Sequence, residues 1–125
     1  MNKISIQIFG REFNLPIEYE HYSNQEILLI QKEAAENLSN AELEIAKAKK
    51  YIEEYCLAHN KNNFLSNDID NIFKYVMPKY LLVKREMNSR VVAVMCNYKF
   101  DMEHGIAIVF KNEMFSKIVS QDIIL

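Results

Sequence analysis

The densest group of side chains that could do chemistry lies at residues 101–105, which read Asp-Met-Glu-His-Gly. A second polar group, Ser120 to Asp122, lies near the C-terminus. Carboxylates and an imidazole can bind a divalent cation, transfer protons or attract a partner of opposite charge. The first group falls in a predicted turn between two apolar strands. What it can do depends on whether the fold brings the two groups together.

The register of the last predicted hairpin places the two groups at one end of the sheet. If the chain turns at residues 112–113, the numbers of opposed residues sum to about 225, because antiparallel partners run in opposite directions. His104 then lies opposite Gln121 or Asp122, within a residue or two. We therefore expect a candidate partner-binding set formed by Asp101, Glu103, His104, Gln121 and Asp122.

Three interpretations of this set remain open. In the structural one, Asp101 hydrogen-bonds to amides of the turn, Gly105 takes a positive φ, and an acidic neighbour holds His104. In the second, the carboxylates and His104 bind a metal, although a single histidine without a second one at suitable spacing is a weak signal. In the third, the set belongs to a surface that docks another protein, and its acidic groups give electrostatic complementarity.

The sequence offers no nucleophile or cofactor motif. Cys56 falls on the inner face of a predicted helix and Cys96 inside an apolar strand, whereas a reactive thiolate needs partial exposure and a positive neighbour. Both cysteines are expected to be buried and reduced. With glycine only at positions 10 and 105, the chain cannot form a glycine-rich phosphate cradle. We predict no enzyme, no cofactor and no catalytic residue.

Length and charge limit the number of domains and the kinds of partner that the chain could have. The 125 residues, 50% of them hydrophobic, suit one domain over 1–125 with one sizeable core. A net charge of −2 disfavours nucleic acid as a partner. No apolar run approaches the roughly 18 residues that a membrane span needs, and the N-terminus does not read as a signal peptide. We expect a cytoplasmic protein.

An N-terminal β-hairpin is predicted over residues 3–19. Isoleucine alternates with polar residues at Ile4, Ile6 and Ile8, which is the pattern of a half-buried strand. Residues 10–11 suit a two-residue turn, with glycine at its first position. Pro16 lacks a donor, which favours an edge position for the second strand.

Helices are predicted next. Residues 23–26 fit a capping box at the start of a first helix, and residues 39–42 repeat that pattern at the start of a second. A short third helix over 68–76 would begin after Asn67 and end at Pro78.

The rest of the chain reads as strands, at 80–86, 90–98, 105–111 and 115–124. The short connections between them favour a four-stranded antiparallel meander. Because the elements come in blocks, the fold class is α+β: a hairpin, two to three helices and the meander, with the helices on one sheet face.

Residues 91–110, the closing segment 120–125 and the preceding residues 71–78 resemble a family of small uncharacterised bacterial domains. In that family an Asp-x-Glu-His-Gly turn is followed by a hydrophobic strand and a closing Gln-Asp segment. Val119-Ser120 departs from the expected valine or isoleucine followed by glycine. The resemblance implies a small bacterial cytoplasmic domain similar to the immunity-type proteins of bacterial toxin systems. It assigns no catalytic residue.

These observations favour a non-enzymatic protein-binding domain, with an immunity protein that neutralises a cognate bacterial toxin as the specific hypothesis. The alternative is a metal-dependent hydrolase or metal-binding domain centred on the turn from Asp101 to His104. The oligomeric state stays open, because the apolar residues 123–125 could pair within the sheet or across a dimer.

Overall fold

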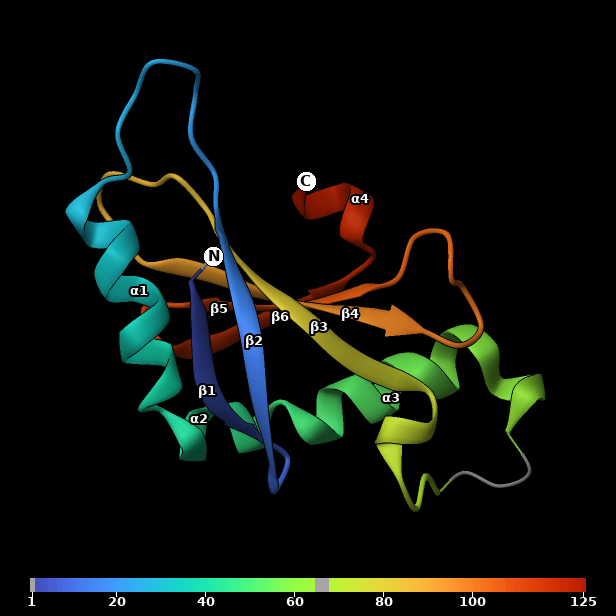
Figure 1. Cartoon of the computed structure of the whole chain (residues 1–125). Helices are drawn as coiled ribbons and strands as arrows, with labels where there is room; N and C mark the ends of the chain where they lie inside the picture. Colours follow the sequence, from blue (N-terminus) through green and yellow to red (C-terminus); the bar gives the residue numbers. More distant parts are fainter. Residues whose placement is uncertain (1, 65–67) are drawn as a thin grey trace.

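The computed structural model describes residues 2–64 and 68–125. A six-stranded sheet, ordered β1-β2-β3-β4-β5-β6, is flanked by helices (Figure 1). The prediction of an α+β fold is confirmed. The strands are β1 (Lys3–Ile8), β2 (Arg11–Tyr19), β3 (Val76–Val83), β4 (Val91–Tyr98), β5 (Ile106–Lys111) and β6 (Met114–Val119). The helices are α1 (Leu29–Ser39), α2 (Glu42–Lys47), α3 (Lys49–Asn60) and α4 (Gln121–Ile124), with 3₁₀ turns at Lys61–Asn63 and Ile72–Lys74.

The sheet is mixed, and the predicted four-stranded antiparallel meander is only part of it. Strands β3 to β6 are antiparallel neighbours. The hairpin β1–β2 joins them through a parallel pairing of Ile17–Tyr19 with Leu81–Val83. Helices α1, α2 and α3 lie in the connection between β2 and β3, and a helical crossover of this kind is what allows two strands to run parallel.

The N-terminal hairpin is confirmed, but its turn is one residue earlier than predicted. Ile8 pairs with Arg11, so the turn consists of Phe9 and Gly10, with φ values of 52° and 82°. Strand β2 is not an edge strand, which contradicts the prediction from Pro16. Its pairing with β3 begins only at Ile17, so the missing N–H of Pro16 interrupts no bond to β3.

The first helix begins later than the capping box at residues 23–26 predicts. Asn24 has a φ of 68°, which is incompatible with a helix. Helix α1 begins at Leu29, where the buried Gln31 takes over the capping role: its Oε1 accepts from the backbone N–H of Leu28 at 3.0 Å. Its Nε2 donates to the carbonyl of Glu20 at 2.8 Å, which ties α1 to the end of β2.

The second predicted helix is present but is divided at Ala48 into α2 and α3. The third predicted helix, over 68–76, is wrong, and its proposed cap, Asn67, lies outside the described residues. Asn71 instead accepts a bond from the N–H of Phe73 and closes a 3₁₀ turn. Pro78 does not end a helix but lies within β3, at the place where its register with β4 shifts, a position that tolerates a residue without an N–H.

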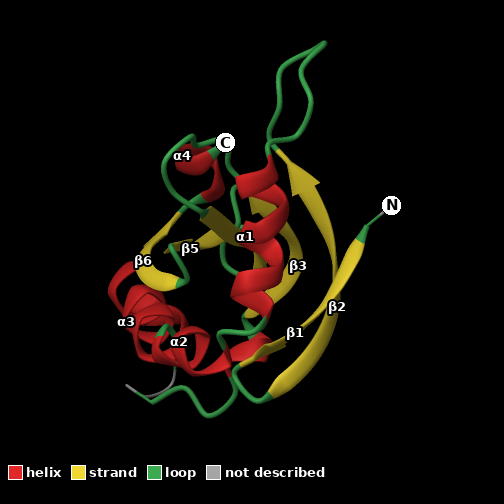
Figure 2. Cartoon of the chain, turned by 90° about the vertical axis from the view of Figure 1, so that its left-hand side faces the viewer, coloured by secondary structure: helices red, strands yellow, loops and turns green. Residues whose placement is uncertain are grey.

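Helices α1, α2 and α3 cover one face of the sheet (Figure 2), as predicted, and the large core lies between them and the strands. The predicted strand 115–124 is too long, because β6 ends at Val119 and α4 turns onto the opposite face. Ile124 of α4 packs there against Leu82, Ala93, Met95, Ala107 and Val109. In the described part of the chain, no helix is long and apolar enough to cross a membrane.

Candidate functional site

The turn between β4 and β5 is held by Asp101. Its Oδ1 accepts from the backbone N–H of His104 at 3.2 Å and lies 3.1 Å from Nδ1 of the same residue. Its carbonyl accepts from the N–H of Gly105 at 2.8 Å. Gly105 has a φ of +65°, and a Cβ there would lie 2.6 Å from the carbonyl oxygen of Cys96. Only glycine fits this position, and the predicted positive φ is confirmed.

The structure brings the C-terminal polar group to this turn. Ala107 pairs with Val119, close to the predicted register, and the chain leaves the sheet just beyond that pair. The Gln121 amide then donates to the carbonyl of Cys96 at 2.9 Å and lies directly over Gly105. Asp122 accepts a hydrogen bond from the hydroxyl of Ser120. The two candidate groups therefore meet at one end of the sheet.

His104 is electrostatically coupled to the carboxylates around it. The hydrogen bond to Asp101 and the attraction of its negative charge raise the pKa of His104, and Glu103 and Asp122 act in the same direction. The bond from Ser120 and the charge of His104 lower the pKa of Asp122. The His104 ring and the carboxylates thus share this end of the sheet, and Glu103 and Asp122 remain exposed to solvent.

Two exposed apolar side chains outside the predicted site set are next to these charged residues in the chain. Met102 is 64% exposed in the turn, and Ile123 is 64% exposed on α4. Met102 directly precedes Glu103 in the chain, and Ile123 directly follows Asp122. Met102 is an apolar residue inside an otherwise polar turn, and that anomaly was the available signal for it. The exposure of Ile123 was missed because residues 115–124 were predicted to form a strand, whereas residues 121–124 form α4.

Neither cysteine has the environment of a reactive thiolate. Cys56 and Cys96 are buried free thiols, as predicted. Burial raises the pKa of Cys56 to about 11 and that of Cys96 further, so both stay protonated at neutral pH. Within residues 2–64 and 68–125, no group of three or more histidine, cysteine or acidic residues is arranged to hold a metal ion.

Comparison with known proteins places the chain in a family. A family model described as "Domain of unknown function (DUF6985)" matches residues 1–125. The chain belongs to this family. No curated protein and no solved structure matches it. Family membership agrees with the small domain that the turn motif implied, while a bacterial origin and an immunity-type role remain predictions.

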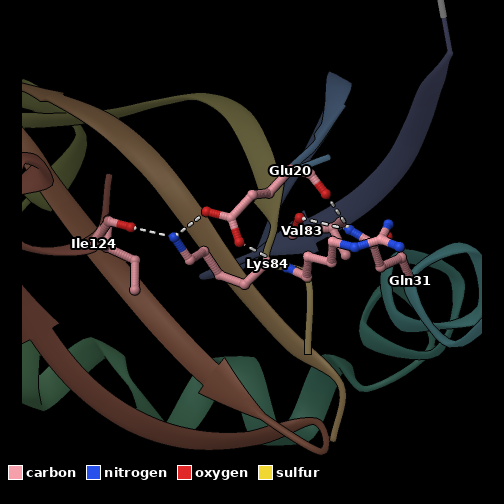
Figure 3. Close-up of polar contacts among 6 residues, drawn as sticks. Glu20, Gln31, Val83, Lys84 and Ile124 are labelled. Atoms are coloured by element: carbon pink, nitrogen blue, oxygen red, sulfur yellow. Dashed lines mark hydrogen bonds and ion pairs between the residues drawn. The ribbon is translucent and has the colours of Figure 1, made fainter. Parts of the chain in front are cut away.

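The second half of the site, α4, is fixed to the sheet by Lys84. Figure 3 shows the Lys84 side chain between the carboxylate of Glu20 and the carbonyl of Ile124, and Nζ lies 2.6 Å from an oxygen of each. The other carboxylate oxygen of Glu20 accepts from the N–H of Arg85 at 2.9 Å. The carbonyl of Glu20 also accepts from Gln31 of α1, so Glu20 and Lys84 together connect the end of β2 to α1, to the end of β3 and to α4.

Proposed function

We propose that the protein is a non-enzymatic protein-binding domain that uses the turn 101–105 and α4 to hold its partner, and that it acts in the bacterial cytoplasm as an immunity protein against a cognate toxin. The observation that carries the proposal is the composition of this end of the sheet. Met102 and Ile123 offer apolar contact, and Glu103 and Asp122 offer negative charge beside them. Exposed apolar groups bordered by charges are the usual make-up of a protein-recognition surface.

The rigidity of the surface supports the same proposal. Asp101 fixes the turn, Gln121 anchors the start of α4, and Lys84 holds its end. A surface that is already ordered loses little conformational entropy when it binds, which favours tight association. Its negative charge suits a basic partner, and a toxin that acts on nucleic acid has that character.

The test is to capture the tagged protein from native cells, to identify by mass spectrometry the protein that comes with it, and to repeat the capture with variants. Glu103→Gln combined with Met102→Ser should abolish a stoichiometric partner, because it removes both charge and apolar contact while the Asp101 bonds remain. Glu36→Gln, on the exposed side of α1, is the matched control and should leave the complex intact. A complex that survives the double variant unchanged would reject this surface.

A toxin partner makes a further, separate prediction. Co-expression of the captured partner without the protein should arrest growth, and co-expression with the protein should relieve the arrest. A partner that is harmless on its own would leave the binding role in place but reject the immunity role.

A further inference from the structure

The last strand of the sheet, β6, has one neighbour. It pairs with β5 from Met114 to Val119 and stands at the end of the strand order. Figure 2 shows it at the outer side of the sheet, on the same side as α2 and α3. No other described strand pairs with its outer edge, so backbone donors and acceptors along that edge are available to another strand.

A hollow of about 570 Å³ lies beside this edge on the helix-covered face, between β6 and helices α2 and α3. The ring of Tyr51 stacks on that of Phe115, with centroids 4.6 Å apart and planes at 5°, and forms its apolar floor. The Nζ of Lys50 lies 4.9 Å from the centroid of Tyr51. Lys49 and Lys50 are exposed and have no ion pair with any described residue.

A second hollow, of about 290 Å³, lies beside the same strand on the opposite face. Lys111 and Lys117 line it together with Ser116. Both lysines are exposed, and neither forms an ion pair within the described part of the chain. The free edge of β6 is therefore bordered by unpaired positive charge on both faces of the sheet.

The charge of this border differs from that of the whole chain. The residues that line the two hollows include six lysines and three glutamates, whereas the whole chain carries −2. Lysine on an edge strand disfavours pairing with a like-charged or apolar strand. Two copies of β6 paired side by side would bring Lys117 of one copy toward Lys117 of the other, and like charges opposite one another are destabilising. A strand with carboxylates at alternating positions has the matching chemistry.

We propose that the outer edge of β6 receives an extended acidic segment of a partner protein, which extends the sheet by one strand. The backbone of the segment bonds to β6. Because side chains alternate between faces, carboxylates at every second position all lie on one face, where they meet Lys117 of β6 and Lys111 of the neighbouring β5. The apolar side chains between them lie on the other face, against the ring of Tyr51 and beside Lys49 and Lys50. This edge carries charge opposite to that of the turn 101–105, and it constitutes a separate interaction surface.

The experiment is an amide NMR titration of the full chain with two capped synthetic peptides, one alternating Glu with Val and one alternating Lys with Val. The Glu peptide should shift the amides of residues 114–119 and slow their hydrogen exchange, and the Lys peptide should not. Lys111→Gln combined with Lys117→Gln should lower the affinity for the Glu peptide by about three- to tenfold, as expected for the loss of two exposed ion pairs. Lys32→Gln, an exposed lysine of α1, is the control and should change nothing.

Four outcomes would overturn the proposal. The Glu peptide could leave residues 114–119 unshifted, or the Lys peptide could shift them equally. Shifts that grow with protein concentration in the absence of peptide would assign the edge to a second copy of the chain. A single-stranded oligonucleotide that shifts the same amides more than the Glu peptide would assign the lysines to phosphate. The variant Glu103→Gln should bind the Glu peptide normally, which separates this surface from the one proposed above.

Discussion

On one face of the sheet, α1, α2 and α3 bury a continuous core that includes Ile108 and Phe110, both at most 1% exposed. On the other face, a helix of four residues covers small side chains such as Ala93 and Ala107. The first face is covered through the burial of a large apolar surface. The second is covered by a short segment that Lys84 and Gln121 anchor through hydrogen bonds. The difference shows that the stability of the fold and the arrangement of its candidate site depend on different faces.

Substitution of two adjacent leucines of β3, one on each face, compares how much the two faces contribute to the free energy of unfolding. Leu81 is fully buried toward the helices, and Leu82 is 5% exposed on the face of α4. Leu81→Ala should lower the free energy of unfolding by about 4 kcal/mol and Leu82→Ala by about 2 kcal/mol, because the thinner cover of Leu82 can collapse into the space left behind. Urea unfolding of both variants is the measurement. Equal losses would mean that α4 packs as firmly as the three larger helices.

The two glycines extend the comparison to the turns. At Gly10 (φ +82°) a Cβ would meet no atom within 4 Å, so Gly10→Ala should cost about 1 kcal/mol through its backbone conformation alone. Gly105→Ala adds the clash with Cys96 and Gln121 and should cost about 3 kcal/mol. Thermal unfolding distinguishes them. A Gly105→Ala protein as stable as Gly10→Ala would show that Gln121 is not held over the turn.

The Lys84 contacts test how α4 is retained. Lys84→Met should cost about 1 kcal/mol and speed hydrogen exchange in residues 121–125, since Nζ bonds both Glu20 and Ile124. Lys79→Met, on the exposed side of β3, is the control.

Burial raises the pKa of Glu20, but the bonds from Lys84 and Arg85 outweigh it, and the net pKa lies below the ordinary value. The Glu20 contribution to stability is therefore present above the unfolded-state pKa and is lost as the pH falls through the folded-state one. Lys84→Met should flatten this acid dependence in pH-dependent urea unfolding. An unchanged acid dependence would place its origin elsewhere.

The smallest expected effect concerns His104. Its pKa is raised by Asp101, so the stabilising pair is complete below the unfolded-state pKa of His104 and is lost as the pH rises through the folded-state pKa. Asp101→Asn should return the pKa of His104 toward its ordinary value in an NMR titration. Glu36→Gln, far from this turn, should leave the titration curve in place.

The strands of the C-terminal half and the meeting of the two polar groups could be predicted from the sequence because they depend on local patterns. Continuous apolar runs predicted β4 and β5, and the turn at Asn112 and Glu113, with φ values of 48° and 66°, set the register of β6. The errors arose where a distant contact overrode a local signal. Gln31 caps α1 because it also reaches Glu20, and no spacing rule within residues 23–26 contains that contact.

The parallel pairing of β2 with β3 and the placement of α4 could not be predicted for a similar reason. Periodicity predicts a strand but does not identify its neighbour, and Pro16 suggested an edge only because the short extent of the parallel pairing was unknown. The residues after Val119 are apolar enough for a strand, and it is the bond from Gln121 to Cys96 that directs them onto the other face.

The parallel pairing of β2 with β3 also has a kinetic consequence. The residues it brings together are far apart in the chain: Glu20 and Lys84 are 64 positions apart. The hairpins β1–β2 and β4–β5 need only short loops to close, so they can form early, whereas joining the two halves must overcome the entropy of closing the long segment that carries α1, α2 and α3. We therefore expect closure of that loop to limit the rate of folding, and substitutions at the β2–β3 contact to slow folding more than those in either hairpin.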